Sequence, residues 1–309
     1  MLVSRWRYLC VLFAILPSAL LYASSPEPPA SVAMELRHGV PFVQAMVNGR
    51  GPFTFCVDTG TSNDAIVSPA LAATLKLPVV ARRNLTDISG EHHQQVDEVA
   101  VDSILLAGIE FRSLRAVVHQ PIEGEGSYDG ILGFQLFRNL QLTLDYPKRT
   151  LELSNEAISD PHSPDVRPLL SLHNVPMVNI TVGDMQVEAQ IDSGGLGLCL
   201  PVSVAHDLRF TGAVETIARG TSQVGAFLLQ GGTLKGSIEM AGQVLNAPFV
   251  EISDSFPVAN IGAVPLQGLA ITFDQRNKLV RFRASSRKQH VSEGRMLALA
   301  QTPASSRGY

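Results

Sequence analysis

The sequence is poor in cysteine and in charged residues, and each shortage excludes a class of protein. It contains 3 cysteines in 309 residues, too few for the disulfide framework of a small secreted domain. Charged residues make up 17% of the chain, and the formal net charge is −4. Because such a chain has no strongly basic surface to neutralise phosphates, no nucleic-acid partner is expected.

The sequence also lacks the short motifs of metal, phosphate and serine-hydrolase sites. His92 and His93 have no third ligand at the spacing of a zinc site, and no His-Glu-x-x-His motif occurs. The glycine-rich segment 194–197 lacks the Lys-Ser/Thr pair of a phosphate-binding loop. Ser193 lies outside any nucleophile elbow. We therefore expect neither a metal nor a cofactor.

Long apolar runs are absent except at the N-terminus. Arg5 and Arg7 precede an apolar run over residues 8–21, and small residues follow it. Pro17 interrupts the run, which is shorter than the roughly 20 apolar residues that span a bilayer. This is the pattern of a cleaved signal peptide over residues 1–23, and a retained anchor is the alternative. We expect an exported protein, periplasmic or secreted, that keeps no stable membrane span after cleavage.

The remaining composition is that of a folded β protein. Apolar residues make up 45% of the chain, and its 25 glycines and 19 prolines are spread along it, as in proteins with many short strands joined by turns. The length allows one large or two medium domains. Beyond the signal segment only Cys56 and Cys199 remain. We expect both to be small buried residues inside strands, although the sequence does not decide whether they pair.

One pattern occurs twice in the chain. In each copy a strand enters a glycine turn, and a second strand follows and ends in Asp, then Thr or Ser, then Gly. The first copy covers residues 40–60 and the second covers residues 175–194. The two triplets are Asp58-Thr59-Gly60 and Asp192-Ser193-Gly194. Their aspartates lie at nearly the same distance from the start of each copy, so the chain contains an internal duplication.

The parallel continues after each triplet. A short apolar strand leads to a proline, Pro69 or Pro201, at the first turn of a short helix, where a missing N–H is tolerated. Ser68 is expected to cap the first of these helices. A hydrophobic–hydrophobic–glycine segment follows in each copy, and hairpins over residues 140–153 and 269–282 close the two copies.

The duplication and its flanking segments define the expected domain organisation. We predict an all-β protein made of two pseudo-symmetric β-barrel lobes with a cleft between them. Polar hairpins near residues 87–95 and 218–225 either fold over this cleft or are ordinary exposed hairpins. The expected parts are a signal peptide (1–23), an N-terminal linker (24–34), a first lobe (35–153), a proline-rich linker (154–170), a second lobe (171–283) and a disordered tail (284–309).

Two matching triplets suggest chemistry, whereas one would indicate only a turn. If the two copies pack about a pseudo-twofold axis, Asp58 and Asp192 face each other. Two carboxylates at such a distance share one proton over a broad pH range. One member can then protonate a carbonyl oxygen while the other takes a proton from water, which hydrolyses an amide without a covalent intermediate.

The residues beside the aspartates suit this arrangement. Gly60 and Gly194 allow the backbone to approach closely. The hydroxyls of Thr59 and Ser193 can bond across the axis to the opposite loop and hold both carboxylates in place.

Residues of both copies resemble the bilobal pepsin-like and retropepsin-like aspartic peptidases, especially bacterial exported proteins built from two retropepsin-like units. The resemblance spans about residues 35–283. It implies retropepsin-like lobes, a catalytic pair Asp58 and Asp192, and a hydrophobic–hydrophobic–glycine segment that crosses behind each aspartate. The residues that carry it are Phe55-Cys56-Val57-Asp58-Thr59-Gly60-Thr61-Ser62 with Gly130-Ile131-Leu132-Gly133, and Ala189-Gln190-Ile191-Asp192-Ser193-Gly194 with Ile261-Gly262.

The sequence departs from this family at one position. The residue after the triplet is often Ser, Thr or Ala in the family, and Thr61 fits this pattern whereas Gly195 does not. We therefore expect Asp192 to lack a hydroxyl that could steady it. No tyrosine occupies the first polar hairpin, which favours the retropepsin-like branch of the family.

The resemblance implies an aspartic-type endopeptidase that acts as a monomer on peptide or protein substrates. The alternative is a catalytically silent envelope protein that binds peptides or another ligand in the same cleft, and Gly195 is its only support. Hydrolysis of a non-protein amide by the same aspartate pair is a third possibility. Three further aspartates, Asp129, Asp145 and Asp274, lie at turns and are expected to be structural.

Overall fold

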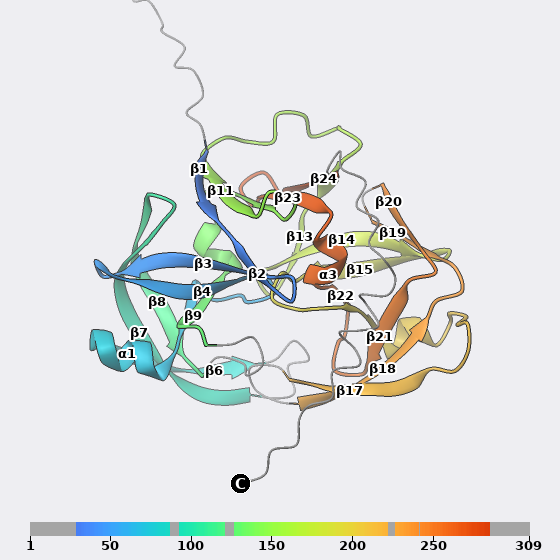
Figure 1. Cartoon of the computed structure of the whole chain (residues 1–309), viewed down its shortest axis with the longest axis horizontal. Coiled ribbons are helices and arrows are strands. Elements are labelled where there is room, and N and C mark those ends of the chain that lie inside the picture. Colours follow the sequence, from blue (N-terminus) through green and yellow to red (C-terminus); the bar gives the residue numbers. More distant parts are fainter. Residues whose placement is uncertain (1–28, 87–92, 121–126, 222–225, 241, 285–309) are drawn as a thin grey trace, which may run out of the picture.

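The structure is a computed structural model that describes residues 29–86, 93–120, 127–221, 226–240 and 242–284 (Figure 1). These residues form strands joined by turns and a few very short helices, so the predicted all-β class is confirmed. The predicted signal peptide and nearly all of the predicted tail lie outside the described residues. None of the described helices is long and apolar enough to cross a membrane.

An eight-stranded sheet is built from residues of the first copy, and we call it the N-terminal sheet. Its strands, in spatial order, are β2 (Glu35–Arg37), β3 (Val40–Val47), β4 (Arg50–Asp58), β9 (Gly130–Gly133), β5 (Ala65–Val67), β8 (Ile109–Val118), β7 (His93–Leu106) and β6 (Val79–Thr86). Helix α1 (Pro69–Leu75) follows β5, and the 3-10 helix η1 (Phe134–Phe137) follows β9.

A ten-stranded sheet is built from residues of the second copy, and we call it the C-terminal sheet. Its main path is β17 (Glu215–Thr221), β18 (Ala226–Thr233), β21 (Phe249–Ser253), β16 (Leu198–Pro201), β22 (Ala259–Ile261), β15 (Met185–Ile191), β14 (Val175–Val182), β19 (Ser237–Met240) and β20 (Gln243–Asn246), with β13 (Leu170–Leu172) paired to β14. Helix α2 (Val202–Ala205) follows β16, and helix α3 (Ala263–Leu266) follows β22.

The two sheets repeat the same arrangement around their central strands. β4 runs parallel to β9, β9 antiparallel to β5, and β5 parallel to β8. β15, β22, β16 and β21 follow the same order with the same directions. β3 and β14 even share one burial pattern, with a single exposed residue in the same place. The internal duplication read from the sequence is therefore present in the fold.

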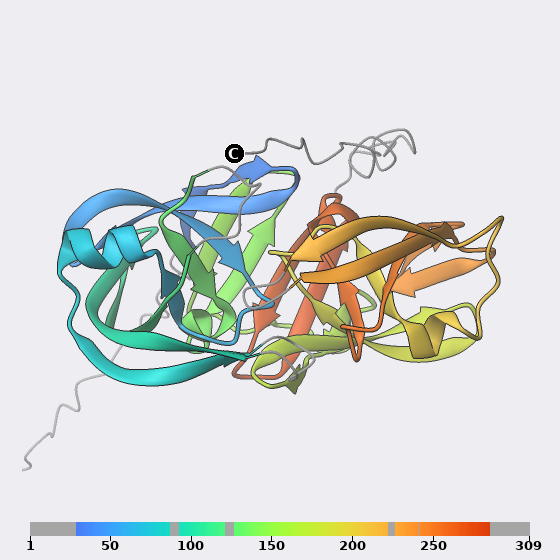
Figure 2. The same ribbon diagram turned by 90° about the horizontal axis from the view of Figure 1, so that it is seen from below.

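A six-stranded sheet joins the two copies, and we call it the shared sheet. Its order is β1 (Ala30–Ala33), β11 (Thr150–Ser154), β10 (Gln141–Asp145), β23 (Leu269–Asp274), β24 (Leu279–Ala284) and β12 (Val166–Pro168). Its centre is the antiparallel pair β10 and β23, one strand from each copy. Figure 2 shows these green and red strands between the blue-to-green sheet at one end and the yellow-to-orange sheet at the other.

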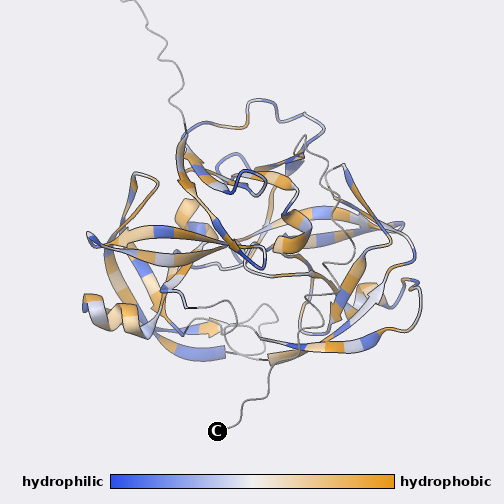
Figure 3. Cartoon of the chain, viewed as in Figure 1, coloured by the Kyte–Doolittle hydropathy of each residue, from blue (hydrophilic) through white to orange (hydrophobic). Residues whose placement is uncertain are grey.

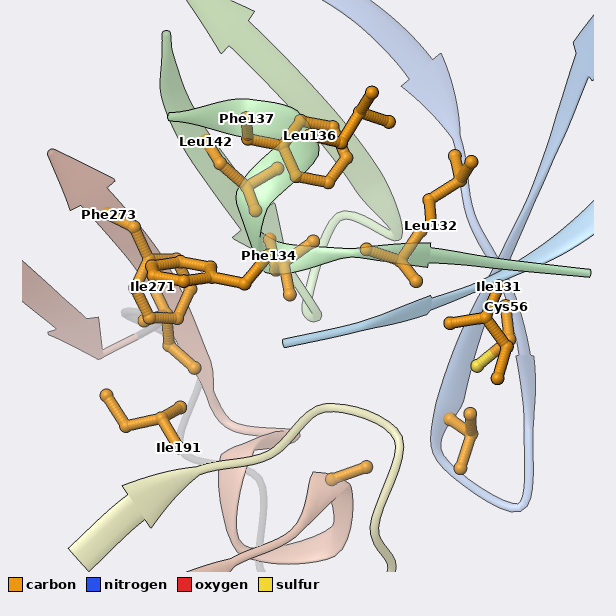
Figure 4. Close-up of a cluster of buried hydrophobic side chains, with 14 of the residues drawn as sticks. Cys56, Ile131, Leu132, Phe134, Leu136, Phe137, Leu142, Ile191, Ile271 and Phe273 are labelled. Atoms are coloured by element: carbon orange, nitrogen blue, oxygen red, sulfur yellow. The ribbon is translucent and has the colours of Figure 1, made fainter. Parts of the chain in front are cut away.

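Alternating hydrophobic residues build a core that runs from the N-terminal sheet through the shared sheet. Figure 3 shows hydrophobic and hydrophilic residues alternating along many strands, the pattern of sheets with one face buried. In Figure 4, Phe134 of η1 lies beside Phe273 of β23, and their ring centroids are 5.3 Å apart in an edge-to-face arrangement. Leu142 and Ile271 are fully buried in the same cluster. Side chains of both copies thus pack into one apolar cluster.

Two segments predicted as linkers contribute strands to the shared sheet. Residues 30–33 of the expected N-terminal linker form β1, which pairs with β11. Residues 166–168 of the expected second linker form β12, which pairs with β24. Both strands are short and lie at edges, where pairing with an existing sheet compensates for a weak apolar pattern. Cys56 and Cys199 are buried thiols in strands rather than halves of a disulfide.

Candidate active site

The two Asp-Thr/Ser-Gly triplets lie at the ends of equivalent strands. Asp58 is the last residue of β4, and Asp192 directly follows β15. The chain then turns, with the N–H of Thr61 bonded to the carbonyl of Asp58 and that of Gly195 to the carbonyl of Asp192, both at 3.2 Å. Both aspartates are half-buried. The duplication therefore presents two carboxylates in the same local conformation.

Four hydrogen bonds cross between the two triplets. The Thr59 N–H donates to Ser193 Oγ at 3.0 Å, and the Ser193 N–H donates to Thr59 Oγ1 at 3.0 Å. The Thr59 hydroxyl donates to the carbonyl of Ile191 at 2.7 Å, and the Ser193 hydroxyl donates to that of Val57 at 2.8 Å. Thr59 and Ser193 are fully buried. These bonds are charge-neutral, reciprocal and buried, and a fully satisfied buried network holds its members rigidly.

The crossed bonds place each carboxylate against the glycine of the opposite triplet. A Cβ on Gly194 would lie 2.7 Å from Asp58 Oδ1, and one on Gly60 would lie 2.6 Å from Asp192 Oδ1. Only glycine leaves room for this approach. The structure thus brings together Asp58, Asp192 and the glycines of both triplets.

The proximity of the two carboxylates affects their charge. Burial, and next the negative charge of Asp192, raise the pKa of Asp58 to about 8. Asp58 is therefore protonated at neutral pH while it lies beside Asp192. A pair of this kind carries one proton between its members.

The two aspartates accept hydrogen bonds from different donors. Asp58 accepts the Gly60 N–H on Oδ1 at 2.8 Å and the Thr61 hydroxyl on Oδ2 at 2.7 Å. Asp192 accepts the N–H groups of Gly194 and Gly195 on Oδ1, at 3.0 Å and 2.9 Å. Its Oδ2 accepts the side-chain amide of Asn260 at 2.9 Å. The two halves share the bond from the glycine of the triplet and differ in the remaining donors.

Asn260 supplies a side-chain donor to Asp192. The sequence offered no hydroxyl for Asp192 at position 195, and the side-chain amide of Asn260 donates to it instead. Asn260 was missed because it lies in a strand and far from the triplet in sequence. Its signal is a break in the duplication: the first copy has Ile131-Leu132-Gly133 where the second has Asn260-Ile261-Gly262.

The segments that end in Gly133 and Gly262 run directly behind the two loops, as the resemblance implied, although the second has Asn260 at its first position. β9 pairs with β4 so that Gly133 lies opposite Asp58, and β22 pairs with β15 so that Ile261 lies opposite Ile191. A Cβ on Gly133 would overlap the carbonyl of Asn63, and one on Gly262 would lie 2.5 Å from Leu196 C. These glycines are required by close backbone contact.

Tyr146 is a second residue near the pair that sequence reasoning did not single out. It follows β10 and is buried, and its hydroxyl has no hydrogen-bond partner among the described residues. Burial, and then the charges of Asp192, Cys56 and Asp58, raise its pKa. Tyr146 therefore stays neutral beneath the pair.

The three other aspartates considered from the sequence lie beside turns or in a connection. Asp145 and Asp274 end β10 and β23 just before turns, and Asp129 lies in the connection before β9. Asp145 accepts the Lys148 N–H at 3.0 Å, and Asp129 accepts the Thr54 N–H at 2.8 Å. Asp274 accepts the Asn277 N–H at 3.2 Å. Asp145 and Asp274 bind backbone N–H groups of the turns that follow them, and Asp129 binds a backbone N–H of β4. None of the three joins Asp58 and Asp192.

Comparison with known proteins points to one family. Residues 43–136 match the model of a family described as aspartyl protease. The matched segment contains the first triplet, Asp58-Thr59-Gly60, and the segment Ile131-Leu132-Gly133 that pairs behind it. No curated protein matches the chain. Residues 43–136 are therefore similar to an aspartyl protease domain, and the match supports the retropepsin-like resemblance.

Proposed function

We propose that this chain is an aspartic-type endopeptidase that hydrolyses peptide bonds with water activated by Asp58 and Asp192. The observation that carries the proposal is the set of crossed hydrogen bonds between Thr59 and Ser193, which holds two carboxylates from two repeats against each other. A purely structural loop has no need to bring two acidic groups together, because their repulsion destabilises the fold.

In the proposed mechanism the two aspartates have different protonation states. Asp58 carries the shared proton, since burial and the charge of Asp192 raise its pKa to about 8. Asp192 is the carboxylate, and its three hydrogen bonds all come from N–H donors. A water between them is positioned to lose a proton to one member while the other protonates the substrate.

Peptide hydrolysis by this pair proceeds without a covalent enzyme intermediate. Asp192 takes a proton from the water as the water oxygen bonds to the carbonyl carbon, and Asp58 gives its proton to the carbonyl oxygen. The resulting tetrahedral gem-diol collapses when the C–N bond breaks. The amine nitrogen takes the proton from Asp192, and one hydroxyl of the gem-diol gives its proton back to Asp58 as the carboxylic acid forms. The pair then again holds one proton and is ready for another turnover.

The proposal extends to the substrate and its place in the cell. A peptide lies extended in a cleft between two lobes, the N-terminal and C-terminal halves, with the scissile bond over the aspartate pair. The chain acts as a monomer, because both aspartates come from one chain. The basic and apolar pattern of residues 1–23 supports export to the periplasm or the exterior.

The test is cleavage of a mixed peptide library by the wild type and by Asp58→Asn and Asp192→Asn, read by mass spectrometry. Both substitutions keep the size of the side chain and remove its ability to exchange protons. We expect each to reduce kcat by at least about 100-fold, the lower range for loss of general acid–base catalysis. Asp102→Asn, the same change at an exposed position of β7, is the matched control and should retain full activity.

Equal cleavage by all four proteins would contradict the assignment of Asp58 and Asp192. Tight binding of peptides without cleavage, unchanged by both substitutions, would instead identify the chain as a silent binding protein. Cleavage only of non-peptide amides would keep the mechanism and change the substrate.

A further inference from the structure

The two halves of the site provide a side-chain donor to their aspartates from different positions. In the first half, Thr61, three residues after Asp58, donates its hydroxyl to Oδ2. The strand behind carries an apolar Ile131, which pairs with Cys56. In the second half the residue three after the aspartate is Gly195, which has no side chain.

The second half places its donor on the strand behind the loop. Asn260 pairs with Gln190 in the register in which Ile131 pairs with Cys56, so Asn260 occupies the equivalent position. Its amide nitrogen lies 2.9 Å from Asp192 Oδ2. The donor has therefore moved from the loop to the strand between one half and the other.

A side chain at position 195 and the amide of Asn260 cannot occupy the same space. A Cβ on Gly195 would lie 2.7 Å from Asp192 Oδ2 and 3.0 Å from Asn260 Nδ2. Gly195 does not have a positive φ angle, so its backbone conformation suits residues with a side chain. Glycine is required at position 195 because Asn260 and Asp192 fill the space that a side chain would take.

Packing alone does not account for Asn260. Its side chain is only 5% exposed, and its Oδ1 has no hydrogen-bond partner among the described residues. A buried acceptor left in this state destabilises a fold by about 1–3 kcal/mol. An apolar residue such as that at the equivalent position 131 would avoid this cost. The amide is therefore retained for the bond that it donates.

An amide nitrogen and a hydroxyl differ in the proton positions that they permit. A threonine hydroxyl can donate or accept, so Asp58 can carry a proton on Oδ2 while Thr61 turns to accept it. The Nδ2 of Asn260 and the backbone N–H groups on Oδ1 only donate. A proton on either oxygen of Asp192 would face a donor and displace a hydrogen bond.

We propose that Asn260 is a positioning residue of the peptidase reaction, which keeps Asp192 as the carboxylate that accepts the proton of the water and leaves the shared proton on Asp58. This inference rests on the proposed function and adds to it the origin of the asymmetry. Asn260 acts through Asp192 and does not itself touch the substrate. Asp58, the neutral Tyr146 and the Cys56 thiol are titratable groups that share this environment.

The experiment gives the second half the residues that the first half has at the two donor positions. Four proteins are compared: the wild type, Asn260→Ile, Gly195→Thr and the double variant Gly195→Thr/Asn260→Ile. We expect each single variant to lose roughly 10- to 100-fold in kcat/KM, as is typical when the partner of a functional group is removed. The double variant, which copies the first half, should recover most of this loss.

The pH profile separates positioning from packing. Without Asn260, fewer donors hold the charged form of Asp192, so the acid limb of kcat/KM should move to higher pH. Asn260→Asp keeps the shape of the side chain and removes the donor, and it should lose activity as Asn260→Ile does. Carbon-13 NMR titration of the aspartate carboxyls follows their protonation directly, without a substrate. If Asn260→Ile does not fold, Asn260→Ser replaces it in both measurements.

The outcomes distinguish this inference from the proposed function. An unchanged acid limb and unchanged carboxyl titration in the Asn260 variants, with Asp58→Asn and Asp192→Asn inactive, would overturn the role of Asn260 and leave the peptidase intact. If kcat/KM of the double variant is no higher than that of either single variant, a hydroxyl at position 195 cannot replace the amide of Asn260, and the inference is likewise overturned. If the wild type cleaves nothing, an altered carboxyl titration in Asn260→Ile still supports the role of Asn260 in the pair.

Discussion

Asp58 and Asp192 are the same amino acid in the same local conformation, and their neighbours give them different properties. Both accept the N–H of the glycine that follows two residues later. The second oxygen meets a hydroxyl in one half and an amide in the other, and the first oxygen of Asp192 also accepts the Gly195 N–H. Such small differences decide the protonation state because the two carboxylates are too close to ionise independently.

The raised pKa of Asp58 predicts the alkaline side of the pH–activity profile. The proposed mechanism needs Asp58 protonated, and its pKa is raised to about 8. We therefore expect kcat/KM to remain high at neutral pH and to fall as the pH rises through about 8, measured with a peptide substrate that does not itself titrate. Loss of activity already between pH 5 and 6, with the protein still folded, would contradict this assignment.

The sequence predicted the aspartate pair but not all of the residues that serve it. The triplets and the crossed hydroxyls follow from local patterns that occur twice, so both copies identify the same residues. Asn260 and Tyr146 appear in one copy only, and both come from parts of the sequence distant from the triplet beside them in the fold. A local sequence pattern cannot predict this proximity, because it arises only when strands distant in the sequence pair.

At the scale of elements, boundary signals predicted local structure well. Ser68 and Pro69 predicted the start of α1, and the Ser68 Oγ accepts the Leu71 N–H at 3.0 Å. The short edge strands β1 and β12 were not predicted. Three or four residues carry too little alternation to indicate a strand, and their stability comes from the sheet that they join.

Removal of the Ser68 cap tests the contribution of α1 to stability. Ser68→Ala leaves the Leu71 N–H without its acceptor, so we expect the free energy of unfolding to fall by about 1 kcal/mol. Urea denaturation followed by circular dichroism measures the change. Ser203→Ala is the matched control because Ser203 is exposed within α2, and its effect should stay within about 0.5 kcal/mol. Equal effects of the two substitutions would show that the cap does not matter.

At the scale of the whole molecule, the two copies are connected in two places. β10 and β23 pair at the centre of the shared sheet, where the hydroxyls of Thr143 and Thr272 lie 2.8 Å apart. The crossed bonds of Thr59 and Ser193 connect the copies again at the aspartate pair. Because the shared sheet is common to both copies, neither can unfold without exposing buried surface of the other. The geometry of the site therefore depends on the stability of the entire molecule.

This connection predicts one cooperative unfolding transition, although each copy has its own sheet. Thr59→Val and Ser193→Ala each remove two crossed bonds from a buried network, so each should lower the free energy of unfolding by roughly 1–3 kcal/mol. Their combination should cost less than the sum, since loops released by the first substitution no longer present the remaining bonds in good geometry. Calorimetry of the four proteins measures both effects. Two separate transitions in the wild type, or strictly additive losses, would mean that the copies are held together by the shared sheet alone.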